Sequence, residues 1–185
     1  MGSFVSKREK KYWILASLVV ISILSTTIFL ERPLQKVFVN HDFQVGVFLF
    51  GMLLTATTIG YYGLFHKVNK YEIVIWIGMA AITTMFLFRL GVSERSHIME
   101  FSVLAIFIHL ALSERYRNTS TDMKIMIFSF FLTVFFGLID EGIQFFLPDR
   151  VFDLDDIYFN LIAAAMAIGG MGIFRWLRRQ FKTFT

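Results

Sequence analysis

Long apolar stretches separated by short polar connections occupy most of the chain. Each is close to the about 20 residues that a helix needs to cross about 30 Å of hydrocarbon. The six stretches are Tyr12–Leu30, Phe43–Phe65, Tyr71–Phe88, Ser96–Leu112, Lys124–Leu147 and Asp156–Trp176. This pattern predicts an all-α integral membrane protein, a bundle of about six transmembrane helices that forms a single membrane domain over residues 1–185.

Two of these stretches need separate comment. Ser96–Leu112 is the shortest, about 25 Å long as a helix, and the pattern leaves open whether it spans fully, tilts or is buried by its neighbours. Tyr12–Leu30 is longer than the about 7–15 residues of a signal-peptide core, and no Ala-x-Ala motif follows it. It is therefore predicted to be retained as a signal-anchor helix.

The composition agrees with a membrane protein and removes several classes of chemistry. Of the 185 residues, 17% are charged, whereas a soluble domain carries about 25%. The absence of cysteine excludes disulfides, thiolate metal sites and cysteine nucleophiles. The sequence contains neither a phosphate-binding glycine loop nor a Gly-x-Ser-x-Gly elbow, which disfavours nucleotide and serine-hydrolase chemistry. Nucleic acid is not an expected partner.

The basic residues are distributed unevenly across the predicted helices. If the N-terminus is cytoplasmic, only five of the 18 Lys and Arg residues fall on the outer side: Arg32, Lys36, Arg89, Arg95 and Arg150. Since cytoplasmic loops are enriched in Lys and Arg, both termini are predicted to be cytoplasmic in a plasma-membrane protein. The net charge of +4 then divides into a basic inner side and an acidic outer side.

The fifth apolar stretch carries polar residues at membrane depth. At about 100° per residue, one arc of the helix holds Thr133, Gly137, Asp140, Glu141 and Gln144. Glu141 is about 9 Å inside the outer end of this helix. Two adjacent carboxylates at that depth repel each other and lose hydration, so they must share a proton or meet a cation. Polar side chains of this kind either join helices or mark a ligand site.

The segment that follows adds a second group of polar residues. Asp153 and Asp155 suit the N-terminal end of the sixth helix as capping or solvated residues. Asp156 and Asn160 are four residues apart on one helix face, which continues as a stripe of small residues: Ala163, Ala164, Ala167 and Gly170. Such a stripe allows close helix packing, so this face is predicted to press against the fifth helix. The Arg150 guanidinium suits a carboxylate or a phosphate.

The fourth helix contributes a third group at the same outer level. His97 and Glu100 are three residues apart and share a face, while Arg89 at the end of the third helix is placed to neutralise an acid. His41, His66 and His109 are interpreted as interfacial or packing residues. Acid, amide, imidazole and guanidinium groups from several helices thus meet at one depth, which predicts a shared outward-facing cavity.

These residues resemble the VanZ-like family of membrane proteins, which is associated with teicoplanin resistance. The resemblance covers residues 93–172 and rests on three motifs: His97-Ile-Met-Glu100-Phe101, Asp140-Glu141-Gly-Ile-Gln144, and Arg150 followed by Asp156 and Asn160. Phe101 stands where Tyr is common in the family, and Ala163 and Ala167 stand where glycines are expected. The resemblance implies a role at the cell envelope, with lowered susceptibility to a lipoglycopeptide in at least one member of the family.

The first functional hypothesis is a membrane protein that binds an amphiphile: a lipid, a lipid-linked wall precursor or a lipoglycopeptide. Arg89 and Arg150 would meet anionic headgroups, and acids and amides would accept hydrogen bonds from sugars or amines. The predicted binding residues are Arg89, Glu100, Asp140, Glu141, Gln144, Arg150, Asp156 and Asn160. This hypothesis requires no cofactor, and the sequence is silent on the oligomeric state.

The alternative is an enzyme that acts on a lipid headgroup or a prenyl phosphate. Asp140 or Glu141 would be the general base, His97 a second acid/base, and Arg150 would stabilise developing negative charge. Mg²⁺ or Ca²⁺ bound by Asp140, Glu141 and Asp156 is the one cofactor that the residue types suggest. A small transporter is disfavoured, because the acids gather at one side of the membrane and no inverted repeat is evident.

Overall fold

The computed structural model describes residues 4–30, 70–88, 92–117, 121–147 and 153–182, and almost all of them are helical. The first helix, α1 (Lys7–Ser25), continues directly into a π-helical turn, η1 (Thr26–Leu30). The other elements are α4 (Lys70–Phe88), α5 (Val92–Arg115), α6 (Asp122–Phe146) and α7 (Leu154–Lys182). These ranges contain no strand, which confirms the all-α prediction.

Within the described ranges, four helices are long and apolar enough to cross a membrane. They are Lys7–Ile28, His97–Arg115, Asp122–Phe146 and Leu154–Ile173. The predicted third span falls on α4, whose apolar stretch Trp76–Met85 is shorter. The predicted second span, Phe43–Phe65, lies outside the described residues. Four of the about six predicted spans are therefore supported by a helix of sufficient length.

The chain divides into two compact units. One comprises residues 1–30 and 93–185, and the other comprises residues 31–92, in which α4 is the described helix. The first unit contains α1, η1, α6, α7 and nearly all of α5. All the site residues described below belong to this unit.

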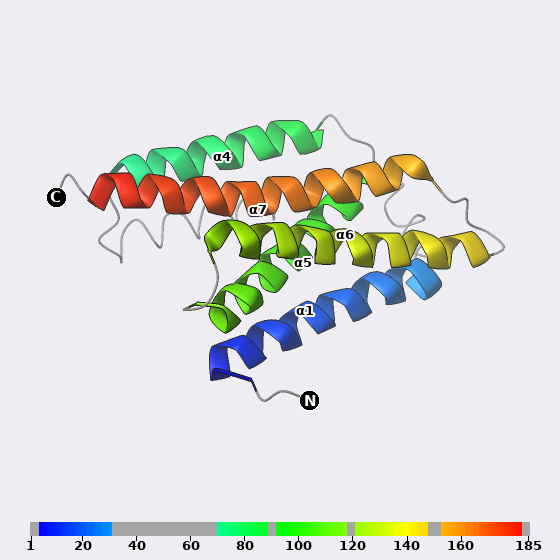
Figure 1. Cartoon of the computed structure of the whole chain (residues 1–185). Coiled ribbons are helices and arrows are strands. Elements are labelled where there is room, and N and C mark those ends of the chain that lie inside the picture. Colours follow the sequence, from blue (N-terminus) through cyan, green and yellow to red (C-terminus); the bar gives the residue numbers. More distant parts are fainter. Residues whose placement is uncertain (1–3, 31–69, 89–91, 118–120, 148–152, 183–185) are drawn as a thin grey trace. The chain divides into compact units, whose positions relative to one another are not determined.

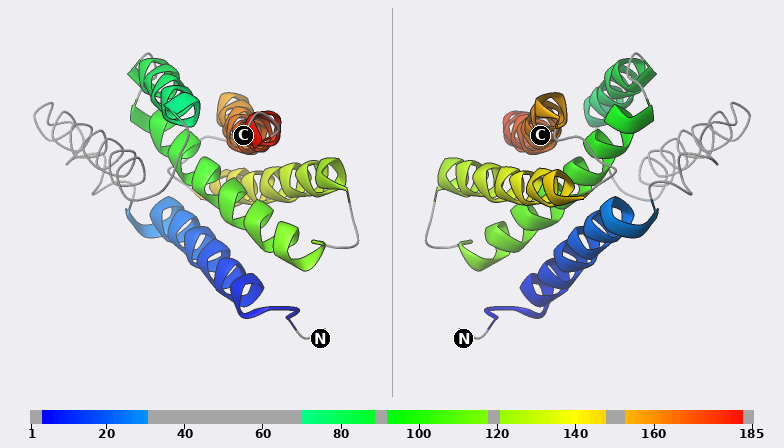
Figure 2. Two further views of the ribbon diagram at one scale, coloured as in Figure 1. Left: turned by 90° about the vertical axis from the view of Figure 1, so that its left-hand side faces the viewer. Right: turned by 90° about the vertical axis from the view of Figure 1, so that its right-hand side faces the viewer.

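Helix α5 is the central helix of the first unit. It passes between α1 and the antiparallel pair α6 and α7 (Figures 1 and 2). Half of its span is buried, against 11–22% for the other three spans. Ala105 of α5 packs with Ala164 and Ile168 of α7, and Met126 and Phe130 of α6 cover this core. The stretch that was shortest in the sequence is thus part of a helix long enough to cross a membrane, and its neighbours bury half of it.

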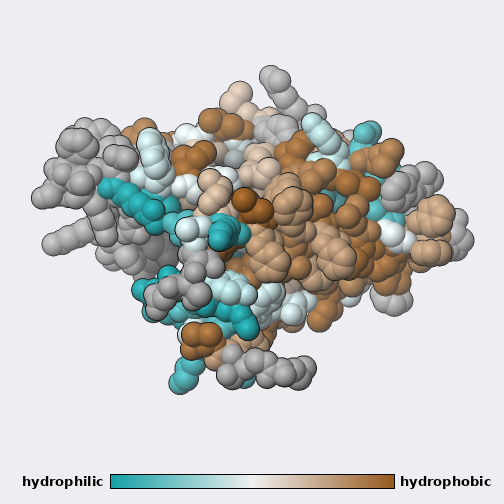
Figure 3. Space-filling view, in the orientation of Figure 1, coloured by the Kyte–Doolittle hydropathy of each residue, from teal (hydrophilic) through white to brown (hydrophobic). Residues whose placement is uncertain are grey.

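Hydrophobic side chains cover the outer face of α6. The large exposed residues there are Ile127, Phe128, Phe131, Phe135, Leu138, Phe145 and Phe146. Figure 3 shows hydrophobic surface along this face, whereas hydrophilic side chains gather toward the end at which α1 begins. A helix exposed to lipid presents an apolar surface of this extent, because apolar side chains that face hydrocarbon are not in contact with water.

The end at which α1 begins is held together by buried charge. Ser6 caps α1 by accepting a hydrogen bond of 3.0 Å from the backbone N–H of Glu9. The fully buried Glu9 carboxylate accepts hydrogen bonds from the Val5 N–H at 2.6 Å and from Arg115 at 2.9 Å. Because Arg115 ends α5, this ion pair joins the start of α1 to the end of the central helix.

Candidate functional site

Four helix ends meet at the opposite end of the first unit. Their polar residues form what we call the polar cluster: Thr27, His97, Glu100, Asp140, Glu141, Gln144, Asp156 and Asn160. Thr27 comes from η1, His97 and Glu100 from the start of α5, and Asp156 and Asn160 from the start of α7. Asp140, Glu141 and Gln144 come from the last turns of α6 and are almost fully buried, as is Asn160.

The carboxylate of Asp140 is held by two donors. Thr27 donates a hydrogen bond of 2.7 Å to its Oδ1, and Gln144, one turn further along α6, donates one of 3.3 Å to its Oδ2. The Gln144 amide also donates to Glu141 Oε1 at 3.1 Å. The spacings of three and four residues place all three α6 side chains on one face. Asp140 is therefore part of the framework that orients the cluster.

His97 brings the start of α5 into contact with the start of α7. Its Nε2 lies 3.7 Å from Asp156 Oδ2, and the two side chains are 10% and 17% exposed. The imidazole is stacked on Phe101, with ring centroids 6.3 Å apart and planes inclined by 12°. Ligand atoms of His97, Glu141 and Asp156 all lie within 4.8 Å of one another. Helices α5, α6 and α7 thus contribute one side chain each to a group of three neighbouring ionisable residues.

Several buried atoms of the cluster have no hydrogen-bond partner among the described residues. They are His97 Nδ1, Glu141 Oε2, and both the Nδ2 and the Oδ1 of Asn160. About 90% or more of buried polar groups in folded proteins are hydrogen-bonded, so four such atoms in one cluster need an explanation. A ligand that enters the cluster would satisfy them.

Close packing of α6 on α7 places Asn160 in the cluster. A Cβ atom at Gly137 would lie 3.2 Å from both Cβ and Nδ2 of Asn160 and 3.4 Å from Phe101. Ala163 and Ala164 are fully buried, and the Ala163 carbonyl accepts a hydrogen bond of 3.4 Å from Ser102 of α5. The small-residue stripe therefore packs against α5 as well as against α6, the helix to which the sequence analysis assigned it.

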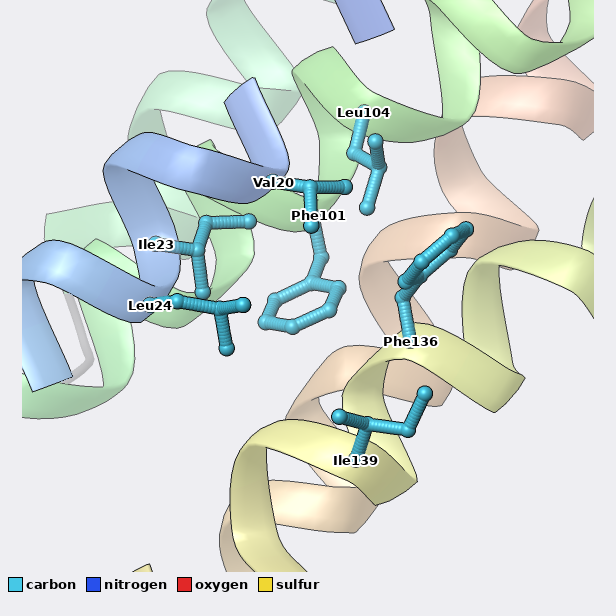
Figure 4. Close-up of a pocket in the computed structure, with 7 residues that line it drawn as sticks. All are labelled: Val20, Ile23, Leu24, Phe101, Leu104, Phe136 and Ile139. Carbon is cyan, nitrogen blue, oxygen red and sulfur yellow. The ribbon is translucent and has the colours of Figure 1, made fainter. Parts of the chain in front are cut away.

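An apolar cavity of about 160 Å³ lies beside the polar cluster (Figure 4). It is lined by Val20, Ile23 and Leu24 of α1, Phe101 and Leu104 of α5, and Phe136 and Ile139 of α6. Phe101 belongs to both places, since its ring lines the cavity and stacks on His97. The polar cluster and the apolar cavity therefore share a wall.

Most of the predicted site residues come together in this structure. His97, Asp140, Glu141, Gln144, Asp156 and Asn160 lie in one cluster, and Glu100 is within electrostatic range of His97 and Asp140. Arg89 and Arg150 lie outside the described residues. Asp153 remains exposed and accepts a hydrogen bond of 2.8 Å from the Asp155 N–H, which agrees with a capping role.

Sequence reasoning missed Thr27 and the polar contacts of His109. The available signal for Thr27 was the run of polar residues Ser25, Thr26 and Thr27 at the end of an apolar stretch. His109 is fully buried and contacts Ser129 at 3.2 Å, Ser113 at 3.3 Å and the Arg175 guanidinium. Its place halfway along an apolar stretch could have indicated a buried partner, because ionisable groups there rarely face lipid.

Comparison with known proteins adds one match. The family model described as VanZ/LLP1 matches residues 12–177, which include every residue of the polar cluster. No curated protein and no solved structure matches the chain.

Proposed function

We propose that this chain, which belongs to the VanZ/LLP1 family, is a cell-envelope membrane protein that binds an amphiphile. The polar cluster would receive the headgroup, and the neighbouring cavity would receive part of an apolar chain. The ligand classes are a membrane lipid, a lipid-linked wall precursor or a lipoglycopeptide. Lowered susceptibility to a glycopeptide antibiotic such as teicoplanin is the proposed consequence.

The observation that carries this proposal is the shared wall between two chemically different spaces. On one side of Phe101 are buried polar atoms without partners, and on the other is a space lined only by apolar side chains. A ligand with one polar and one apolar part satisfies both at once. Ligand pockets commonly combine an apolar lining with a few placed polar groups in this way.

The described residues favour a headgroup rich in hydrogen-bond donors. Among the described residues Glu141 Oε2 has no hydrogen-bond partner, and a carboxylate oxygen of Asp156 lies within 4.8 Å of one of Glu141. Ammonium and hydroxyl groups donate to carboxylates, and such charge-assisted bonds are the stronger class. Asn160 offers both a donor and an acceptor, which suits a sugar hydroxyl or an amide. As in the sequence analysis, Arg89 and Arg150, which lie outside the described residues, are proposed to meet anionic groups of the ligand.

We further propose that the polar cluster faces the outside of the cell and that about six helices span the membrane. The uneven distribution of Lys and Arg supports this orientation, with both termini cytoplasmic. A single Cys introduced at Asn118, in an otherwise cysteine-free chain, is expected to resist a membrane-impermeant maleimide in intact cells and to react after permeabilisation. Labelling from outside would reverse the orientation.

The amphiphile proposal is tested by filling the cavity. Ile139→Trp places a large side chain in the space, and Leu138→Trp places the same side chain on the exposed face of α6, where Leu138 is 49% exposed. We expect native mass spectrometry to show co-purifying lipid on the unaltered protein and on the Leu138 variant. The Ile139 variant should retain at most about one tenth of this lipid, which corresponds to a loss of about 1.4 kcal/mol of binding free energy.

Two results would contradict the proposal. One is a protein free of lipid after extraction in several mild detergents. The other is an equal lipid content in both tryptophan variants, which would assign the lipid to the outer surface of the helices.

A second function is favoured by the position of His97. His97 lies 3.7 Å from Asp156 and stacks on a cavity-lining ring, and in this proposal its imidazole would transfer a proton to a bound headgroup. The alternative is therefore an enzyme acting on a lipid headgroup or a prenyl phosphate, with Asp140 or Glu141 and His97 as acid and base. In this structure Asp140 already accepts two hydrogen bonds, so Glu141 is the better candidate for the base.

A further inference from the structure

The polar cluster contains a set of side chains that is typical of metal ligands. His97, Glu141 and Asp156 come from α5, α6 and α7, and each offers one ligand atom within 4.8 Å of the other two. Atoms bound to one tetrahedral zinc ion at about 2.1 Å lie about 3.4 Å apart. The three atoms would therefore have to approach one another by up to about 1.4 Å to bind a single ion.

The hydrogen bonds of Glu141 leave one of its carboxylate oxygens available. Gln144 donates to Glu141 Oε1, whereas the buried Glu141 Oε2 has no hydrogen-bond partner among the described residues. The imidazole of His97 faces Asp156 with its Nε2, which lies 3.7 Å from Asp156 Oδ2. Gln144 thus orients the Glu141 carboxylate, as residues behind metal ligands commonly do.

The charges of the triad also favour a divalent cation. Glu141 is fully buried, Asp156 is largely buried, and their carboxylate oxygens face each other across a short distance. Two negative charges taken out of water repel each other, and a nearby cation stabilises both. A doubly charged ion with a neutral imidazole would make the group electrically neutral. The partial exposure of Asp156 provides a route of entry from the end of the bundle.

We propose that His97, Glu141 and Asp156 bind one first-row divalent metal ion, with zinc preferred, and leave a coordination position open. Imidazole suits zinc and its neighbours, whereas Mg²⁺ and Ca²⁺ prefer sites made of oxygen alone. Three protein ligands with a fourth position for water or substrate are the pattern of zinc sites that act on a ligand. The triad differs from the trio suggested by sequence, because His97 takes the place of Asp140.

This inference does not rest on amphiphile binding, and it is tested without lipid. The full chain, purified in mild detergent and treated with a chelator, is titrated with ZnCl₂, MnCl₂, MgCl₂ and CaCl₂ by isothermal calorimetry. We expect one zinc per chain, weaker manganese, and no magnesium or calcium at the same concentrations. His97→Gln and Asp156→Asn should each weaken zinc binding by more than about 100-fold, since even changes behind a metal site cost about 10–100-fold.

Asp155→Asn is the matched control, because it removes a neighbouring but exposed carboxylate of α7. It should retain the affinity of the unaltered protein. The proposal is overturned if the unaltered chain binds no zinc at micromolar concentration, if it binds Mg²⁺ or Ca²⁺ more tightly than zinc, or if the triad variants bind as well as the control. If the variants fail to fold, the zinc stoichiometry of the unaltered chain still tests the proposal. The conservative variant Asp156→Glu is then added, and it should keep part of the zinc affinity. Failure here leaves the lipid result with the Ile139 variant unaffected.

Discussion

Replacing Phe101 with alanine is expected to lower the free energy of unfolding by about 3–5 kcal/mol, the cost of removing a large aromatic side chain from a packed core. Phe101 is fully buried in the central helix. Its ring stacks on His97, approaches Gly137 of α6 and lines the apolar cavity. The truncation would join the polar cluster to the apolar cavity. The measurement is the midpoint of unfolding in mixed micelles of SDS and a mild detergent.

The matched controls for this variant lie on the outer face of the same helix. Met99→Ala and Val103→Ala remove apolar side chains that are 56% and 42% exposed. Each should change the free energy of unfolding by less than about 1 kcal/mol, because little packing is lost. If Phe101→Ala were no more harmful than these two, α5 would not be the packed centre of the bundle and the shared wall would lose its support.

The sequence anticipated the buried face of α6 because helical periodicity alone defines it. The predicted arc of Thr133, Gly137, Asp140, Glu141 and Gln144 is fully represented among the buried residues of that helix. Polar residues in an apolar helix are costly toward lipid, so their positions mark the face that turns inward. The meeting of α5, α6 and α7 at one end followed from the same argument.

Other features could not be predicted, because apolar residues look alike whether they face lipid, a neighbour or a cavity. Nothing in the sequence distinguishes Ile139, which lines the cavity, from Phe135, which is exposed. The bond from Thr27 to Asp140 joins residues 113 positions apart, and the pairing of Glu9 with Arg115 spans 106. Such contacts depend on which helices become neighbours, and periodicity within one helix does not report that.

The family resemblance and the structure contribute different parts of the site. The motif residues His97, Asp140, Glu141, Gln144, Asp156 and Asn160 were singled out together by sequence. Their division into separate tasks came from the contacts. Asp140 is held by two donors, while one oxygen of Glu141 has no partner among the described residues. The sequence analysis treated the adjacent carboxylates Asp140 and Glu141 alike, but their contacts give them different roles. Glu141 is therefore the residue whose substitution tests the site.

Glu141→Gln is expected to weaken binding of the amphiphile by about 10–100-fold, since hydrogen bonds to charged groups contribute about 1.5–3 kcal/mol. The change keeps the size of the side chain and a carbonyl oxygen that can still accept the hydrogen bond from Gln144. It removes the charge and one acceptor from a fully buried position. The measurement is native mass spectrometry of the variant during titration with the lipid that the unaltered protein retains.

The same variant separates a binding protein from an enzyme. A binding protein should recover its lipid load, and with it the proposed effect on teicoplanin susceptibility, when the ligand is supplied in excess. An enzyme that uses Glu141 as its base should give no product at any ligand concentration, as followed by mass analysis of the lipid after incubation. Glu114→Gln is the control, because it makes the same chemical change at the opposite end of α5, where the carboxylate accepts from Ser6 at 3.2 Å. If Glu141→Gln left binding, product and susceptibility unchanged, both functions assigned to the polar cluster would be wrong.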